Sequence, residues 1–333
     1  MPDYNKKQGK GDTMAEPNIA MTKALKQKKS RFADLREHKT YYIMLIPLVV
    51  FFTLFNYLPM AGLYNAFTDY DFSKGLFSPF VGLKNFEFLF KGGWDSIVWK
   101  LTRNTMLYNV AFIVLGNICQ IAMAVLLREL TFKKFMKTSQ TLMFMPYFVS
   151  MVVVGSIVYN LFNYKYGVFN NVFTSLGFER FDFYQSPEVW PFIIVIIEIW
   201  KGLGYGTVIY LASIMGIDES VYEAAYVDGA SKWQRIRFIT LPLLKPTVII
   251  LVLFAIGGIM RGQFDLFWNI IGNNGLLLNA TDIIDTYVYR SLTVNFSLGL
   301  GTAAGLYQSM FGLVLVVTVN AIVRKVDREN SLF

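Results

Sequence analysis

Histidine and cysteine, two side chains that often take part in catalysis, each occur once in the 333 residues, as His38 and Cys119. A serine-histidine-aspartate triad or a histidine zinc site would depend on His38, which lies in a highly charged segment without a cluster of partners. Cys119 alone supports neither a disulfide within the chain nor a thiolate metal cluster. We therefore expect a non-catalytic protein with no metal site and no cofactor of its own.

The chain also lacks the phosphate-binding loop of an ATPase. No G-x-x-x-x-G-K-S/T pattern occurs, and the run Gly9, Lys10, Gly11 lies in a segment too polar to fold as the strand and helix that such a loop requires. If ATP drives this protein, a partner must bind and hydrolyse the nucleotide with its Mg²⁺.

The segment 218–242 is the most informative part of the sequence. Asp218 and Glu219 suit the positively charged start of a helix, and an apolar face follows at helical spacing. That face consists of Val221, Ala224 and Ala225. Gly229 then interrupts the helix, so the pattern predicts a bend at this glycine.

A second short helix is predicted after the bend. Ser231 with Gln234 three residues later is typical of a capping box, which starts a helix that we expect to run toward Leu241 and to end at Pro242. The loop would then consist of two short helices held beneath a membrane.

The surface of this loop suits a contact with another protein. Small side chains at Ala224 and Ala225 would let a partner close around the helix backbone, and Glu223 offers a carboxylate. Gly229 allows a left-handed turn. An amphipathic helix lying on the inner leaflet would have similar features, so physical reasoning alone leaves both interpretations open.

The fixed positions of segment 218–242 resemble the EAA loop of ABC importer permeases, EAA-x3-G-x9-I-x-L-P, without a departure. They are Glu223, Ala224, Ala225, Gly229, Ile239, Leu241 and Pro242, and we add Asp228 beside the glycine. The resemblance implies that the loop forms a coupling helix docked in a cleft of an ATPase subunit.

Three further stretches resemble the polysaccharide-type branch of the carbohydrate-uptake permeases; they are residues 55–72, 81–90 and 281–292. The resemblance implies a type I importer fold with two similar permeases side by side, two copies of an ATPase subunit beneath, and a periplasmic or extracellular solute-binding protein above. It implies an oligosaccharide substrate; a permease for a non-sugar solute is the alternative.

The composition predicts that the elements carrying these motifs cross a membrane. Hydrophobic residues make up 54% of the chain and charged residues 16%. Six apolar runs approach or exceed the roughly 20 residues that a helix needs to span the hydrocarbon core, the fifth being the shortest. They are residues 41–66, 104–127, 140–162, 190–214, 245–260 and 301–323. We therefore predict an all-α membrane protein with six transmembrane helices.

The basic residues predict the orientation of these spans. The two termini and the even-numbered connections hold 21 of the Lys and Arg residues, and the other three connections hold 9. Basic flanks stay on the cytoplasmic side, so residues 1–40 and 324–333 would be cytoplasmic tails of a multi-pass permease domain, 41–323, in a bacterial cytoplasmic membrane. Anionic lipid accounts for the net charge of +8, without nucleic acid.

Polar and aromatic residues inside the spans are candidates for a sugar path. Polar groups are costly in lipid and tend to face protein or a water-filled cavity. Glu198 and Lys201, three residues apart on one helical face, would either neutralise each other or line the path. The predicted path residues are Asn160, Glu198, Trp200, Lys201, Tyr205 and Gln308. Ordinary packing would explain any single aromatic ring equally well.

Glycines at positions 202, 204 and 206 of the fourth span would either loosen its helix or permit close helix contact. Two other classes of protein remain as alternatives. A secondary transporter would also be apolar and polytopic, but it would not explain the loop. A membrane-embedded enzyme would require a catalytic constellation that this chain lacks.

Overall fold

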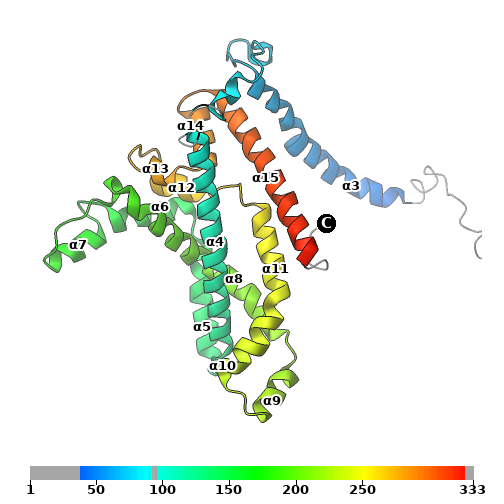
Figure 1. Cartoon of the computed structure of the whole chain (residues 1–333), viewed down its shortest axis with the longest axis vertical. Helices are drawn as coiled ribbons and strands as arrows, with labels where there is room; N and C mark the ends of the chain where they lie inside the picture. The colour runs from blue at the N-terminus through cyan, green and yellow to red at the C-terminus, as the bar shows by residue number, and fades with distance from the viewer. Residues whose placement is uncertain (1–37, 90, 92, 94–95, 327–333) are drawn as a thin grey trace, which may run out of the picture. The chain divides into compact units, whose positions relative to one another are not determined.

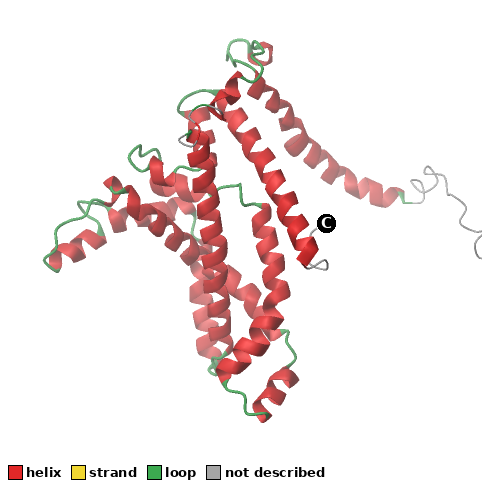
Figure 2. Ribbon diagram, viewed as in Figure 1, coloured by secondary structure: helices red, strands yellow, loops and turns green. Residues whose placement is uncertain are grey.

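The computed structural model describes residues 38–89, 91, 93 and 96–326. These residues are almost entirely helical, and their extended segments meet only in one isolated bridge between Thr68 and Phe80 (Figure 2). Five of the described helices are long and apolar enough to cross a membrane, or six if one bent pair is a single span. The predicted all-helical membrane fold is confirmed.

The chain divides into two compact units, Met1–Ala61 and Gly62–Phe333. The described part of the first unit holds α3 (Lys39–Phe52) and a π-helical turn (Thr53–Tyr57), followed by the start of a 3₁₀ segment (Leu58–Phe67). Together these elements form an apolar run of 29 residues, in agreement with the predicted first span.

Four long helices dominate the second unit (Figure 1). They are α4 (Ile97–Arg128), α8 (Trp190–Met215), α11 (Leu241–Gly257) and α15 (Leu298–Val326). The remaining α-helices are α5 (Lys133–Phe144), α6 (Met151–Phe162), α7 (Val168–Ser175), α9 (Glu219–Val227), α10 (Lys232–Arg235), α12 (Phe264–Ile271), α13 (Leu278–Thr281) and α14 (Ile284–Thr293). Helices α7, α9, α12, α13 and α14 lie in the connections between the predicted spans.

Helices α4 and α8 pack closely along their length because small residues allow it. A Cβ at Gly206 would lie 2.1 Å from Cδ of Gln120 on α4, and a Cβ at Gly204 would lie 2.2 Å from the carbonyl oxygen of Met143 on α5. Of the two roles predicted for the glycines at 202, 204 and 206, close helix contact is observed at Gly204 and Gly206, whereas a Cβ at Gly202 would meet no heavy atom within 4 Å. Around one part of this contact, Ala124, Tyr210 and other buried apolar side chains form a core cluster.

The third span is not the straight helix that the sequence predicted over residues 140–162. Helix α5 and the following 3₁₀ turn (Met145–Phe148) meet α6 at an angle of 98°. Pro146 lies in the turn, and the Ser150 side chain accepts a hydrogen bond from the Val153 N–H, which starts a new helix. We call residues 145–150 the third-span break.

The predicted helix end at Pro242 is also wrong. Helix α10 continues through a π-helical turn (Ile236–Thr240) into α11, giving one run of 26 residues, Lys232–Gly257. Pro242 lies in the first turn of α11 and has no N–H to donate, and the wider turn before it accommodates the proline ring. The fifth span therefore begins and ends earlier than predicted, and residues 258–263, here called the fifth-span break, lead to α12.

Candidate functional site

Helix α9 begins at residues that the sequence identified. The Asp218 side chain caps the helix by accepting a hydrogen bond of 2.9 Å from the Ser220 N–H, which holds the pKa of Asp218 below its usual value. Glu219 in the first turn forms an ion pair of 2.9 Å with Arg128 at the end of α4. The start of the loop is thus tied to a membrane-spanning helix.

Tyr222, three residues after Glu219 and on the same face, also anchors α9. Its side chain is buried, and its hydroxyl lies 3.0 Å from Oγ1 of Thr240 in the π-helical turn. The Arg128 guanidinium lies over the tyrosine ring, 4.0 Å from its centroid. The anchoring residue is therefore Tyr222, whereas Val221 and Ala224 of the predicted apolar face are exposed.

The bend after α9 is a Schellman motif centred on Gly229. The Gly229 N–H donates to the carbonyl oxygen of Tyr226 at 3.0 Å, and the Ala230 N–H donates to that of Ala225 at 2.9 Å. Gly229 has a φ of +79°, a left-handed conformation that favours glycine. The predicted bend at Gly229 is confirmed.

The capping box predicted for the second helix is also formed. Ser231 Oγ accepts from the Gln234 N–H at 3.3 Å, and Gln234 Oε1 accepts from the Ser231 N–H at 2.7 Å. Helix α10 therefore starts where the sequence placed it.

Around Glu223 the exposed residues of α9 are mainly apolar, and Glu219 adds a second exposed carboxylate at the start of the helix. Val227 is 84% exposed and Tyr226 69% exposed, and Glu223 is exposed between them and the start of the helix. The other residues of the predicted coupling set are arranged as follows: Ala224 and Asp228 are exposed on the loop, Ala225 is half-buried, Ile239 is half-buried in the π-helical turn, and Leu241 and Pro242 are exposed on α11.

Lys201 donates its hydrogen bonds to the third-span break and forms no ion pair with Glu198. Its ammonium group donates to the carbonyl oxygens of Pro146 at 3.3 Å, of Tyr147 at 3.1 Å and of Val149 at 2.5 Å. These carbonyls have lost helical partners because the span bends there, so the lysine satisfies them. The ion pair expected from the sequence spacing is replaced by these three bonds.

Glu198 contacts the fifth-span break. Its Oε1 accepts a hydrogen bond of 2.9 Å from the Gln263 side chain, and its buried Oε2 has no hydrogen-bond partner among the described residues. Gln308 on α15 donates to the carbonyl oxygen of Met260 at 2.5 Å and to Oδ2 of Asp285 at 2.9 Å. The fifth-span break is thus held by Glu198 of α8, Gln308 of α15 and Asp285 of α14.

The aromatic candidates lie on an exposed part of the same region. Tyr205 stacks on Tyr147 of the third-span break, with ring centroids 5.1 Å apart and an angle of 13° between the rings. Trp200 is 44% exposed and Tyr205 48% exposed. Asn160 lies on α6, exposed, and donates to the Ser156 carbonyl oxygen of its own helix. The two breaks therefore bring together Lys201, Tyr205 and Glu198, whereas Asn160 forms its hydrogen bond within α6.

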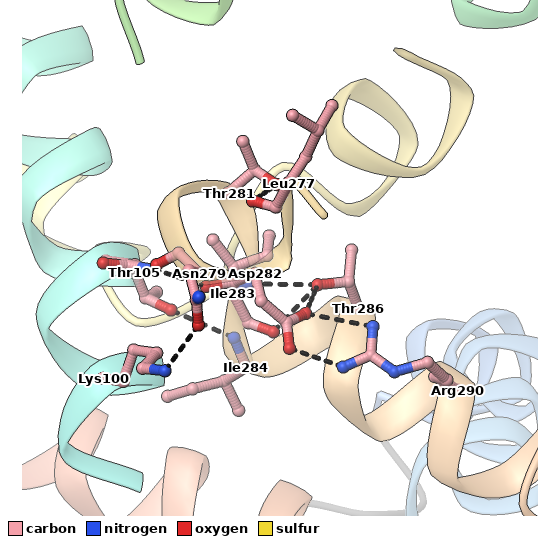
Figure 3. A network of polar contacts seen from close by, with 11 residues as sticks. Lys100, Thr105, Leu277, Asn279, Thr281, Asp282, Ile283, Ile284, Thr286 and Arg290 are labelled. Carbon is pink, nitrogen blue, oxygen red and sulfur yellow. Dashed lines mark hydrogen bonds and ion pairs between the residues drawn. The ribbon is translucent and has the colours of Figure 1, made fainter. Parts of the chain in front are cut away.

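A buried polar network joins α4 to the segment around α13 and α14 (Figure 3). Asp282 forms an ion pair with Arg290, and its Oδ1 accepts from the Thr286 hydroxyl at 2.8 Å. On α4, Thr105 accepts from the Ile284 N–H at 3.1 Å. Sequence reasoning singled out residues 281–292 only through their family resemblance and did not predict this network, because Thr105 and Ile284 lie 179 residues apart.

Residues 113–328 match the family described as the binding-protein-dependent transport system inner membrane component. Protein LplB of Bacillus subtilis (strain 168) is 33% identical over 301 residues, which cover 90% of this chain and 93% of LplB. The polygalacturonan/rhamnogalacturonan transport system permease protein YteP of the same organism is 33% identical over 311 residues, which cover 91% of this chain and 94% of YteP.

Solved structures agree with these matches. A chain of the bacterial alginate ABC transporter, in complex with alginate pentasaccharide-bound periplasmic protein, has a TM-score of 0.79 and 30% identity over 90% of this chain and 98% of that chain. Fold and sequence together define a multi-pass permease subunit of a membrane transport system. The chain belongs to the family of binding-protein-dependent transport system inner membrane components, and the family predicted from the EAA resemblance is confirmed.

Proposed function

We propose that this chain is the membrane-spanning permease subunit of an ABC importer for saccharides. The single observation that carries the proposal is α9, an exposed apolar helix with a central carboxylate, anchored by Tyr222 and Arg128 to the ends of the spans. The family match supports the transport role. Saccharides are favoured over other solutes because YteP is named for polygalacturonan and rhamnogalacturonan and the solved relative for alginate.

The partners follow from this role. A second, similar permease completes the path. Of the two copies of an ATPase subunit, one binds the coupling loop of each permease. A solute-binding protein delivers the substrate. The ATPase subunits bind ATP and Mg²⁺, and this chain has no catalytic step of its own. Both termini lie in the cytoplasm, as the distribution of basic residues predicts.

The mechanism is a rigid-body transmission from the ATPase subunits to the spans. Closure of the ATPase dimer moves α9, and its contacts with Arg128 and Thr240 pass the motion to α4 and to the helical run Lys232–Gly257. The substrate passes along the predicted path, whose residues are partly exposed and partly half-buried. The residues that we assign to it are Asn160, Glu198, Trp200, Lys201, Tyr205 and Gln308.

The test is reconstitution of the complete importer in nanodiscs with its binding protein. Glu223→Lys reverses the charge on the exposed face of α9, and Glu179→Lys makes the same change at an exposed residue outside the coupling loop. We expect only Glu223→Lys to reduce co-purification of the ATPase subunits and the hydrolysis stimulated by loaded binding protein. Equal behaviour of the two variants would show that α9 does not contact the ATPase.

A further inference from the structure

A cavity of about 550 Å³ opens at the fifth-span break. The end of α11, the break and α15 form most of its wall, and α14 contributes one carboxylate. Its polar lining consists of Arg261, Asp285, Gln308 and Ser309. Gly257 and Gly312 line it without side chains and leave space beside these polar groups. Apolar residues complete the wall, so the cavity offers a few polar groups in an otherwise apolar setting.

The cavity lies at the depth of the membrane. Gln308 is ten residues from the start of α15, which places it about 15 Å from that end and about 27 Å from the other at 1.5 Å per residue. Irregular backbone at such depth occurs only where protein covers it or where it borders water. The fifth-span break is therefore a wall of the protein interior or of a water-filled path, and does not face lipid.

Arg261 is the one charged side chain of this cavity that lacks a bonded partner among the described residues. The neighbouring carboxylate is already engaged, since Asp285 Oδ2 accepts from the Gly262 N–H at 2.6 Å and from Gln308 at 2.9 Å. Lys201 is not available to a ligand in the same way, because its ammonium group already donates to three carbonyl oxygens. The guanidinium of Arg261 is exposed and keeps its donors free.

We propose that Arg261 binds the carboxylate of an acidic saccharide, such as a uronic acid residue, as it passes through the permease. This inference rests on the proposed function and narrows its substrate class. A guanidinium presents two parallel N–H groups that match a carboxylate, and it remains charged at any physiological pH. A neutral saccharide offers no charge to pair with this guanidinium, so the site favours the acid.

The surrounding contacts hold Arg261 in place before a ligand arrives. Gln308 and Asp285 fix both neighbours of the arginine, at Met260 and Gly262. Helix α14, which carries Asp285, is itself held by the buried network around Asp282 (Figure 3). A preformed site of this kind loses little conformational freedom on binding.

Arg261 could instead serve only as a distant counter-ion for Asp285. The two roles make different demands on the ligand. A counter-ion acts equally whatever passes through the cavity, whereas a carboxylate-binding residue separates acidic from neutral saccharides of the same shape. A matched pair of probes therefore distinguishes them.

The experiment measures binding of trigalacturonic acid and of its fully methyl-esterified form to the complete importer in nanodiscs, without binding protein, by titration calorimetry. We expect the wild-type importer to bind the acid at least about tenfold more tightly than the ester. Arg261→Gln should abolish this preference by weakening binding of the acid alone, and Arg261→Lys should keep part of it.

Three results would overturn the inference. They are equal affinity of the wild type for both probes, an equal loss for both probes in Arg261→Gln, or no measurable binding of the acid at about 1 mM. Hydrolysis stimulated by loaded binding protein is measured on the same samples. If stimulation is intact and the charge preference is absent, the saccharide-importer assignment stands and only the role of Arg261 fails.

Discussion

Replacing Gly229 with alanine tests how far the coupling loop depends on the bend after α9. At a φ of +79° a residue with a Cβ is less stable than glycine by about 1–2 kcal/mol. No other heavy atom lies within 4 Å of the position that a Cβ would take, so the substitution adds strain without a clash. A penalty of this size lowers the population of the bent conformation by a factor of about 5–30.

Gly177 provides a matched control at the end of α7. It has a φ of +85°, and a Cβ there would also meet no heavy atom within 4 Å. The Gly177 N–H donates to the Thr174 carbonyl oxygen and the Phe178 N–H to that of Phe173, which is again a Schellman motif. Gly177→Ala therefore introduces the same strain in a different loop.

The assay is co-purification of the ATPase subunits together with hydrolysis stimulated by loaded binding protein in nanodiscs. We expect Gly229→Ala to lose most of the stimulation and Gly177→Ala to keep it. Gly229→Asn should retain more activity than Gly229→Ala, because asparagine tolerates the left-handed region, and Gly229→Val should retain less. If both alanine variants lose stimulation equally, or neither does, the bend after α9 is not part of the coupling to ATP hydrolysis.

Three further experiments test the contacts around the spans. Lys201→Met should lower the unfolding temperature and sugar uptake, since each carbonyl left without a donor costs about 1–3 kcal/mol, and Lys201→Arg should restore part of both. A double-mutant cycle between Glu198 and Gln263 should give a larger interaction energy than one between Glu198 and Lys201. A larger energy for Glu198 and Lys201 would show that these two side chains pair, as their spacing in the sequence suggested. Tyr222→Phe removes the bond to Thr240 and should destabilise the complex by about 1 kcal/mol in thermal unfolding.

Local patterns in the sequence were sufficient for the coupling loop. The Ser231 capping box, the Asp218 cap and the bend at Gly229 each depend on residues within a few positions of one another. Such contacts form whatever the rest of the chain does, so residue types and spacing predict them. Pro242 is the exception within the loop, because a proline either ends a helix or occupies the first turn of the next one.

The contacts of the polar span residues could not be predicted in the same way. Lys201 has a carboxylate three residues away in sequence, but its observed partners lie 52 to 55 residues away in the third-span break. Pro146 and the Ser150 cap mark the break in the sequence, but the 98° angle between the two helices is a property of the packed protein. The sequence therefore identified Glu198 and Gln308 as important polar residues without revealing what they bind.

The continuous helical run Lys232–Gly257 has a mechanical consequence. Its 26 residues extend about 39 Å, so a rotation of about 5° at the end beside the coupling loop displaces the far end by about 3 Å, roughly the diameter of a water molecule. That far end borders the cavity of Arg261. If α9 docks on an ATPase subunit as proposed, a small tilt of this helical run would change the width of that cavity.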